Sequence, residues 1–388
     1  MNRQKVVTVI GTRPEAIKMM PVVRELNNRS DLFDHTLVAT AQHRQMLDQV
    51  LSVFGVSPDI DLGLMQHDQT LGGFASRALA CLFDLFGQLK PDCILIQGDT
   101  TTVTIAALAA FYQGVSVGHV EAGLRSFDNK NPFPEEMNRR LAGCLSGMHF
   151  APTERSQMNL LREGVPADNI FVTGNTIVDA LRSIPRDGEF EDSRLSSIDF
   201  DRKRVLLVTA HRRENHGEPL RNICWALKEL VRDFDDVEIV YPVHLNPNVR
   251  SIVRSELGDV PGMHLVDPVS YNDLLRLMSR CHLILTDSGG IQEEAPSFNK
   301  PVLVLRETTE RPEVIEVGAG RIVGTDTNRI VRVASQLLTD DLEYQAMSSA
   351  ENPFGDGHAA ERIVDILEQR LCGMFIREEV AELAYASV

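Results

Sequence analysis

Residues 286–296 (TDSGGIQEEAP) carry side chains and glycines that could bind a phosphate. They follow the apolar run 282–285, which is typical of a buried strand. Glycines allow a ligand to approach the backbone, and a helix N-terminus offers free N–H groups and a partial positive charge. The pattern predicts a phosphate grip at Ser288, Gly289 and Gly290, although an ordinary strand-to-helix turn contains the same glycines.

Charged side chains also follow other apolar runs at the point where each predicted strand ends. They are Arg13 after 6–10, Asp99 after 93–97, Glu121 after 115–120, His211 after 205–209 and Arg311 after 301–305. Ligands of open α/β sheets bind beyond the carboxyl ends of the strands. We therefore expect these residues to gather around one ligand.

The types of these residues favour a nucleotide sugar. Arg311 can support the phosphate grip, and Glu294 can accept hydrogen bonds from ribose hydroxyls. Arg13 and Lys18 form a cationic pair near a predicted helix start, and Glu135 begins another helix. The carboxylates can act as acids and bases on the sugar. No G-x-x-x-x-G-K-[ST] sequence is present and no G-x-G-x-x-G follows a strand, which disfavours ATP and tightly held dinucleotides.

The elements that position these residues alternate between strand and helix in both halves of the chain. Expected strands include 93–97 and 237–242, and expected helices include 71–89 and 271–280. This alternation predicts an α/β fold with two Rossmann-like, doubly wound domains facing a cleft. We expect the domains at 1–175 and 176–358, with a polar linker or exposed loop at 182–204.

Composition limits the partners and the compartment. The chain has 388 residues, 43% hydrophobic content and a formal net charge of −16, which argues against nucleic acid and anionic membranes. The first residues have no signal-peptide core and no stretch is long enough to span a membrane, so we expect a cytoplasmic protein. Its six cysteines have no C-x-x-C or metal spacing. We expect reduced thiols, with neither disulfides nor a metal site.

Seven motifs resemble the bacterial non-hydrolysing UDP-N-acetylglucosamine 2-epimerases, and the resemblance runs from about residue 6 to 367. The motifs are GTRPEAIK at 11–18, GDTT at 98–101, HVEAGLR at 119–125, PEEMNR at 134–139, GNT at 174–176, HRRE at 211–214, and residues 286–296 with 308–312. The resemblance implies a glycosyltransferase B type fold, a homodimer, no cofactor, and interconversion of UDP-GlcNAc and UDP-ManNAc for surface polysaccharides. It also implies that a C-terminal helix within 359–388 packs on the first domain.

The resemblance implies roles for individual residues. Contacts to UDP fall on Arg13, Ser288, Gly289, Gly290, Glu294 and Arg311, with Lys18 close by. Catalytic roles fall on Asp99, Glu121, Glu135 and His211. A second, activating nucleotide sugar is implied at Gln42, Gln45, Gln69, Glu135, Arg212 and His244. Where relatives often carry a glutamine and an aromatic residue near uracil, this chain has Val269 and Leu274.

The implied chemistry is anti elimination of UDP to 2-acetamidoglucal, followed by re-addition on the other face. The sequence does not assign which carboxylate removes the C2 proton and which returns it. A glycosyltransferase of the same fold, a hydrolysing epimerase and a catalytically dead sugar sensor are the alternatives. The retained acids and His211 argue against the sensor, because a binding protein does not need them.

Overall fold

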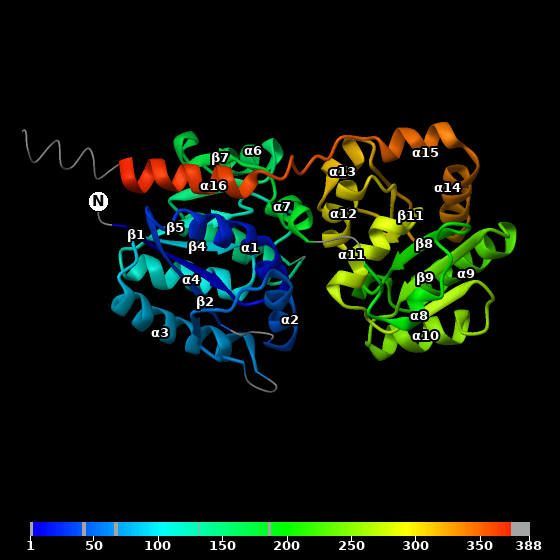
Figure 1. Cartoon of the computed structure of the whole chain (residues 1–388), viewed down its shortest axis with the longest axis horizontal. Coiled ribbons are helices and arrows are strands. Elements are labelled where there is room, and N and C mark those ends of the chain that lie inside the picture. Colours follow the sequence, from blue (N-terminus) through cyan, green and yellow to red (C-terminus); the bar gives the residue numbers. More distant parts are fainter. Residues whose placement is uncertain (1–2, 41–43, 66–68, 131, 185–187, 374–388) are drawn as a thin grey trace, which may run out of the picture. The chain divides into compact units, whose positions relative to one another are not determined.

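The computed structural model describes residues 3–40, 44–65, 69–130, 132–184 and 188–373. These residues form two compact units. Unit 1 contains the described residues up to Ile184 together with those from Phe354 onward, and unit 2 contains the residues between them. The chain therefore leaves unit 1 and later returns to it (Figure 1).

Unit 1 is built on a parallel sheet in which the described strands follow the order β3-β2-β1-β4-β5-β6-β7. The strands are β1 (Gln4–Ile10), β2 (Phe33–Ala39), β3 (Ile60–Asp61), β4 (Cys93–Gln97), β5 (Ser116–Val120), β6 (Met148–Ala151) and β7 (Ile170–Val172). Most of them are rich in β-branched and other apolar residues, and every residue of β4 is buried. Strands buried on both faces need helices on both sides of the sheet.

Helices cover both faces of the unit 1 sheet, with α3 on one side and α16 on the other (Figure 1). The helices are α1 (Arg13–Asn28), α2 (Arg44–Phe54), α3 (Leu71–Leu89), α4 (Thr101–Tyr112), α5 (Glu135–Leu145), α6 (Glu154–Arg162), η1 (Ala167–Asn169), α7 (Thr176–Ser183), α16 (Ala359–Leu367) and the π-helical η4 (Glu368–Cys372). Side chains from β4, β5, α3 and α4 share one apolar core.

Unit 2 repeats the arrangement, and its described strands follow the order β10-β9-β8-β11-β12-β13 in a second parallel sheet. The strands are β8 (Arg204–Thr209), β9 (Val237–Pro242), β10 (Met263–Val266), β11 (Leu283–Thr286), β12 (Val302–Val304) and β13 (Gly320–Ile322). Two parallel sheets wound by helices confirm the predicted fold class.

The helices described in unit 2 are α8 (Ser193–Ser196), η2 (Arg213–Asn215), α9 (Glu218–Asp233), α10 (Pro247–Leu257), α11 (Tyr271–Arg280), α12 (Gly289–Glu294), η3 (Ala295–Phe298), α13 (Pro312–Glu316), α14 (Thr327–Thr339) and α15 (Asp341–Ser348). Side chains of α9, α10, α14 and α15 share one apolar core with those of β8, β9 and β11. Sequence analysis missed α10, α13, β13 and α15.

The return of the chain to unit 1 is made by α16, which packs against α1 and α7. Its buried residues include Ala360, Ile363, Val364 and Leu367. The boundary predicted after residue 175 lies before α7, whereas the compact unit extends to Ile184 because α7 packs on α1.

Of the two alternatives predicted for 182–204, the exposed segment is confirmed for most of residues 188–203, whereas a linker between the domains was wrong for them. Residues 188–203 belong to unit 2 and contain the short helix α8. Leu195 is fully buried, and Phe190 stacks on Phe200 with ring centroids 5.5 Å apart. The buried Asp273 also accepts hydrogen bonds from two backbone N–H groups of this segment. A few widely spaced apolar residues therefore fix a segment that is polar on average.

No helix among the described residues is long and apolar enough to cross a membrane.

Candidate functional site

Each sheet has one topological switch point, a pair of neighbouring strands from which the chain continues towards opposite edges of the sheet. It lies between β1 and β4 in unit 1, and between β8 and β11 in unit 2. Ligands of doubly wound sheets bind at such switch points. Arg13 and Asp99 follow the two unit 1 strands, and His211 and Ser288 follow the two unit 2 strands. These four sequence-predicted residues therefore lie at the strand ends where doubly wound sheets bind ligands.

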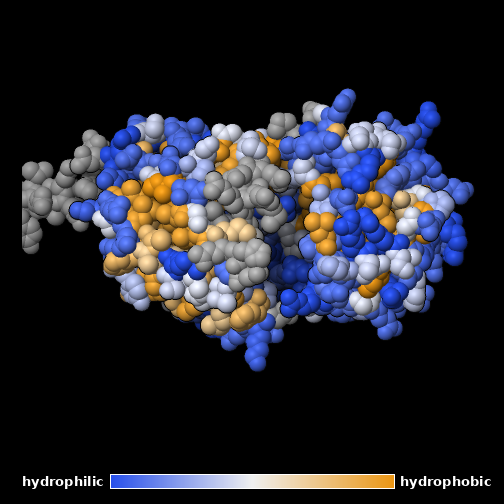
Figure 2. Space-filling model, turned by 90° about the horizontal axis from the view of Figure 1, so that it is seen from below, coloured by the Kyte–Doolittle hydropathy of each residue, from blue (hydrophilic) through white to orange (hydrophobic). Residues whose placement is uncertain are grey.

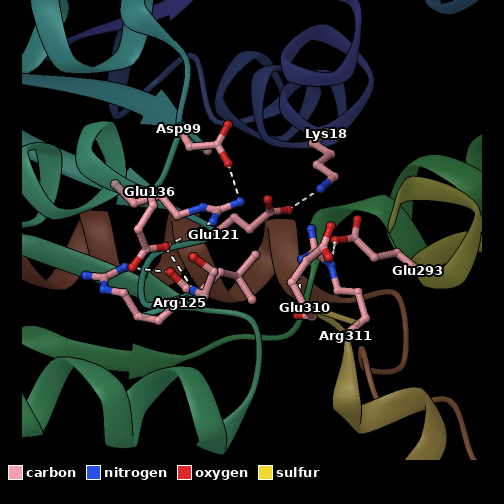
Figure 3. Close-up of polar contacts among 12 residues, drawn as sticks. Lys18, Asp99, Glu121, Arg125, Glu136, Glu293, Glu310 and Arg311 are labelled. Carbon is pink, nitrogen blue, oxygen red and sulfur yellow. Dashed lines mark hydrogen bonds and ion pairs between the residues drawn. The ribbon is translucent and has the colours of Figure 1, made fainter. Parts of the chain in front are cut away.

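Glu121 is the central carboxylate of unit 1 and is only 7% exposed. Lys18, on α1, forms an ion pair with its Oε2 atom, and Asn175 Nδ2 donates a hydrogen bond to the same oxygen at 3.2 Å (Figure 3). Glu121 has a φ of 63°, in the left-handed region that few residues other than glycine adopt. Contacts from α1 and from the N-cap residue of α7 thus hold a strained residue directly after β5.

Asp99, two residues after the end of β4, lies in a second ion pair of unit 1. Arg139 Nη2 is 2.5 Å from Asp99 Oδ2, and Arg139 Nη1 is 3.5 Å from Glu136 Oε2 (Figure 3). Glu136 is fully buried and accepts hydrogen bonds from the backbone N–H groups of Ser126 and Phe127. The motif PEEMNR therefore contributes Glu136 and Arg139 to the site, as well as the predicted Glu135.

Arg13 and Glu135 begin α1 and α5, and both side chains are half-buried. Neither makes an ion pair with another residue of the described ranges. Between the strand ends lies the buried Glu15, which accepts hydrogen bonds from the Gly11 backbone N–H at 2.5 Å and the Thr100 hydroxyl at 2.6 Å. Burial raises the pKa of Glu15 to about 7, although these hydrogen bonds oppose the shift.

Asp287 is the polar centre of the unit 2 switch point, and its side chain has no solvent exposure. Its Oδ2 atom accepts hydrogen bonds from the backbone N–H groups of His211 and Arg212, both at 2.8 Å, and from Asn215 Nδ2 at 3.0 Å. Sequence analysis missed this role, although Asp287 directly follows β11. One carboxylate thereby fixes the loop after β8 to the end of β11.

His211 lies beside Asp287, with 3.8 Å between His211 Nδ1 and Asp287 Oδ1. Its ring stacks on His244 at a centroid distance of 5.2 Å. Burial lowers the pKa of His211; the Asp287 carboxylate opposes this shift, whereas His244 reinforces it. The arrangement favours a neutral imidazole that can donate or accept a hydrogen bond.

The predicted phosphate grip lies directly after β11, where Ser288 precedes α12 and Gly289 begins it. A Cβ atom on Gly289 would lie 3.0 Å from Glu310 Oε1, so the turn has little room for a larger residue. Gly290 is the second residue of this helix. On the same short helix, Glu294 Oε1 accepts a hydrogen bond from the Tyr271 hydroxyl at 3.3 Å.

Arg311 is buried and pairs through Nε with the carboxylate of Glu293, a residue of α12 (Figure 3). Near it, Glu310 binds Arg306 at 2.5 Å and lies 3.6 Å from Arg212. Burial alone would raise the pKa of Glu310, but the three arginines outweigh it and lower the pKa to about 2. Unit 2 therefore concentrates arginines beside the glycine turn, each balanced by a carboxylate.

The residues implied for a second nucleotide sugar are distributed over both units. Arg212 and His244 lie in the unit 2 cluster described above. Gln69, in unit 1, accepts a hydrogen bond from Arg77 at 2.9 Å. Gln42 lies outside the described residues, and Gln45 is on α2, but its side chain lies outside the description.

The fold and the charged strand ends place the chain among two-domain α/β proteins of the glycosyltransferase B type. A family model described as UDP-N-acetylglucosamine 2-epimerase matches residues 24–368. The chain belongs to this family, which confirms the resemblance seen in the sequence.

Individual relatives agree with this assignment. Proteins named UDP-N-acetylglucosamine 2-epimerase from Escherichia coli K12 and Bacillus subtilis are each 52% identical to the chain. The matches cover 94% of this chain and 98% of the first relative, and 95% of this chain and 96% of the second. A solved UDP-GlcNAc 2-epimerase from Neisseria meningitidis, bound to UDP-GlcNAc, matches with a TM-score of 0.85 and 46% identity. That match covers 94% of this chain and all of the other.

Proposed function

We propose that the chain interconverts UDP-GlcNAc and UDP-ManNAc by inverting the configuration at C2 of the sugar. The observation that carries the proposal is the pair of carboxylates at the carboxyl ends of β4 and β5, each held by its own cation. Family membership supplies the substrate class, because the relatives are named for UDP-N-acetylglucosamine. The product would supply ManNAc-type sugars for surface polysaccharides.

The proposed reaction is an elimination followed by an addition. A carboxylate among Asp99, Glu121 and Glu135 removes the C2 proton while the C1–O bond breaks and UDP leaves with its electron pair. The resulting 2-acetamidoglucal then receives a proton at C2 from its other face, and UDP adds back at C1. Because a C2 proton is weakly acidic, departure of the diphosphate must lead or accompany its removal. Arg13 and His211 are suited to stabilise the leaving diphosphate.

The UDP half of the substrate is assigned to unit 2. Ser288, Gly289 and Gly290 offer backbone N–H groups, and the arginines around Glu310 supply positive charge near that turn. Glu294, which accepts a hydrogen bond from the Tyr271 hydroxyl, is suited to accept further hydrogen bonds from the ribose hydroxyls. This division leaves the carboxylates of unit 1 for the sugar.

Proton NMR of UDP-GlcNAc incubated with the enzyme in D2O tests the proposed function. Elimination exchanges the C2 proton with solvent, so the UDP-ManNAc formed should carry deuterium at C2. Product that retains its original C2 proton would contradict the mechanism. Free ManNAc with UDP would instead identify a hydrolysing epimerase, and no reaction without an acceptor would favour a glycosyltransferase.

We also propose that the chain forms a homodimer through unit 1. Hydrophobic side chains gather on one face of this unit (Figure 2). Phe111 and Tyr112, at the end of α4, are about three-fifths exposed, and Phe83 on α3 lies near them because Gln113 donates a hydrogen bond to its carbonyl. Such a cluster marks a protein contact more often than a free surface.

Sedimentation velocity tests the dimer. The parent should sediment as a dimer and Phe111→Asp as a monomer. Leu342→Asp is the matched control, because Leu342 is 80% exposed on unit 2. A monomeric parent, or a Phe111→Asp variant that remains dimeric, would contradict the assignment.

A second molecule of UDP-GlcNAc is proposed to activate the enzyme, as the resemblance implies. His244 supports this proposal because its ring stacks on that of His211, and the resemblance assigns Arg212, the residue after His211, to the same second site. UDP-ManNAc alone should then turn over slowly, and a trace of UDP-GlcNAc should accelerate the reaction. Full-rate conversion of pure UDP-ManNAc without a lag would refute the second site.

A further inference from the structure

We propose that Arg139 is a positioning residue that holds the Asp99 carboxylate in its reactive orientation; this rests on the proposed epimerisation. Asp99 lies in the loop between β4 and α4, directly after Gly98, which has a φ of 81°. Because Asp99 lies outside β4, no strand pairing fixes its backbone, and its side chain is 20% exposed. The contact of 2.5 Å with the Arg139 guanidinium is the anchor that this loop residue needs.

Arg139 is itself held by the buried carboxylate of Glu136, one helical turn earlier on α5. Glu136 Oε2 accepts from the Ser126 N–H at 2.9 Å, and its Oε1 accepts from the Phe127 N–H at 3.3 Å. Because a buried carboxylate that loses its cation is costly, the guanidinium cannot turn away without a large penalty. A continuous polar chain thus runs from the backbone after β5 to Asp99 (Figure 3).

The packing of α5 on α4 sets the distance between Asp99 and Arg139. Asp99 directly precedes Thr100, the N-cap residue of α4, and the helix α5 that carries Arg139 packs against α4. The Thr104 hydroxyl of α4 donates a hydrogen bond to the Asn138 carbonyl of α5 at 3.3 Å. Asp99 and Arg139 are therefore each fixed relative to α4.

An arginine suits this role better than a lysine. Its planar guanidinium contacts Asp99 through one terminal nitrogen and Glu136 through the other, whereas a lysine ammonium offers a single point of charge. A displacement of about 1 Å in a reacting group can cost about 100-fold in rate. Loss of the two-sided contact of the guanidinium should therefore lower kcat strongly and leave KM little changed, since the ion pairs of Arg139 are with Asp99 and Glu136 and not with residues assigned to UDP.

A double-mutant cycle on the full-length enzyme tests the proposal, with kcat and C2 deuterium exchange as readouts. Arg139→Met should lower both by about 100-fold. If Arg139 acts through Asp99, the variant Asp99→Asn with Arg139→Met should be no slower than Asp99→Asn alone. Losses that multiply in the double variant would overturn the proposal, because they would mean that Arg139 acts independently of Asp99.

Two further variants complete the design. Arg140→Met is the matched control, because Arg140 is the next residue on α5, is exposed and bonds Asn129 at 3.0 Å; it should retain parental kcat. If Arg139→Met does not fold, Arg139→Lys takes its place in the same cycle, with the same two outcomes. A parent that fails to epimerise would refute the proposed function, whereas an active parent with a fully active Arg139→Met variant would refute the positioning role alone.

Discussion

Replacement of Arg311 by alanine should destabilise unit 2 as well as weaken UDP binding. Its guanidinium faces the carboxylate of Glu293, whose side chain is only 1% exposed. The variant therefore removes a cation from beside a buried anion. A binding measurement on this variant would mix a lost ligand contact with partial unfolding, so stability has to be measured first.

The magnitude follows from the burial of the pair. Removing one partner of a buried ion pair costs about 3–5 kcal/mol. Domains are stable by about 5–15 kcal/mol in total, so the loss is a large share of the stability of unit 2. An exposed pair contributes about 0–1 kcal/mol. Arg202, which is 87% exposed and 3.8 Å from Asp199, provides the matched control in the same unit.

Urea unfolding monitored by tryptophan fluorescence reports on unit 2, because the only tryptophan of the sequence, Trp225, lies on α9 of that unit. Arg311→Ala should lower the unfolding midpoint markedly, and Arg202→Ala should leave it nearly unchanged. Combining Arg311→Met with Glu293→Gln should recover part of the loss, because the buried anion is then absent. Equal midpoints and slopes for Arg311→Ala and the parent would refute the reasoning.

Three further predictions concern stability. The pKa of Glu310 is lowered to about 2 from its ordinary value of 4.5. The ionised carboxylate therefore contributes to the stability of the folded state above pH 4.5, and this contribution is lost as the pH falls towards 2. Glu310→Gln should therefore be less stable than the parent at neutral pH and converge with it near pH 2, by Trp225 fluorescence. Gly123→Ala should lower the unfolding temperature of unit 1 measured by circular dichroism, because Gly123 has a φ of 91° and its Cβ would lie 2.3 Å from the Ser156 carbonyl oxygen. Leu195→Ala should cost about 2–5 kcal/mol in urea unfolding if residues 188–203 are part of the body of unit 2; an unchanged midpoint would restore the linker interpretation.

Sequence patterns located the regular elements well where local signals were strong. The predicted bounds of α3, β4, β9 and α11 coincide with those of the structure. α11 begins after Ser270, whose hydroxyl accepts a hydrogen bond from the Asp273 N–H, and α3 ends before Lys90, which caps it in a left-handed conformation. Such caps and apolar runs are local, so a single sequence reveals them.

The predictions failed where tertiary contacts outweigh local composition. α10 was missed although Asn246 and Pro247 form a regular helix start, because its exposed face makes the segment polar on average. Residues 188–203 were taken as a linker because the four apolar side chains that anchor them are widely spaced.

Sequence reasoning also found the strand-end acids of the candidate site but not the residues that hold them. Arg139 and Asp287 act through Asp99 and the His211 backbone, which are distant from them in the sequence, and spacing alone does not reveal such pairs. The place of Lys18 near UDP stays a prediction, and its ion pair with Glu121 was not foreseen from the sequence.

The return of α16 to unit 1 has a consequence for biosynthesis. A ribosome delivers β1 to α7 first, then all of unit 2, and only then the helix that covers α1 and α7. At about 5–20 residues per second, the apolar surface that will receive Ile363 and Leu367 stays open on the nascent chain for on the order of ten seconds or more. Unit 2, continuous in sequence, can finish folding during that interval. Truncations that remove α16 should therefore expose apolar surface on α1 and α7 and make unit 1 prone to aggregation, while unit 2 remains folded.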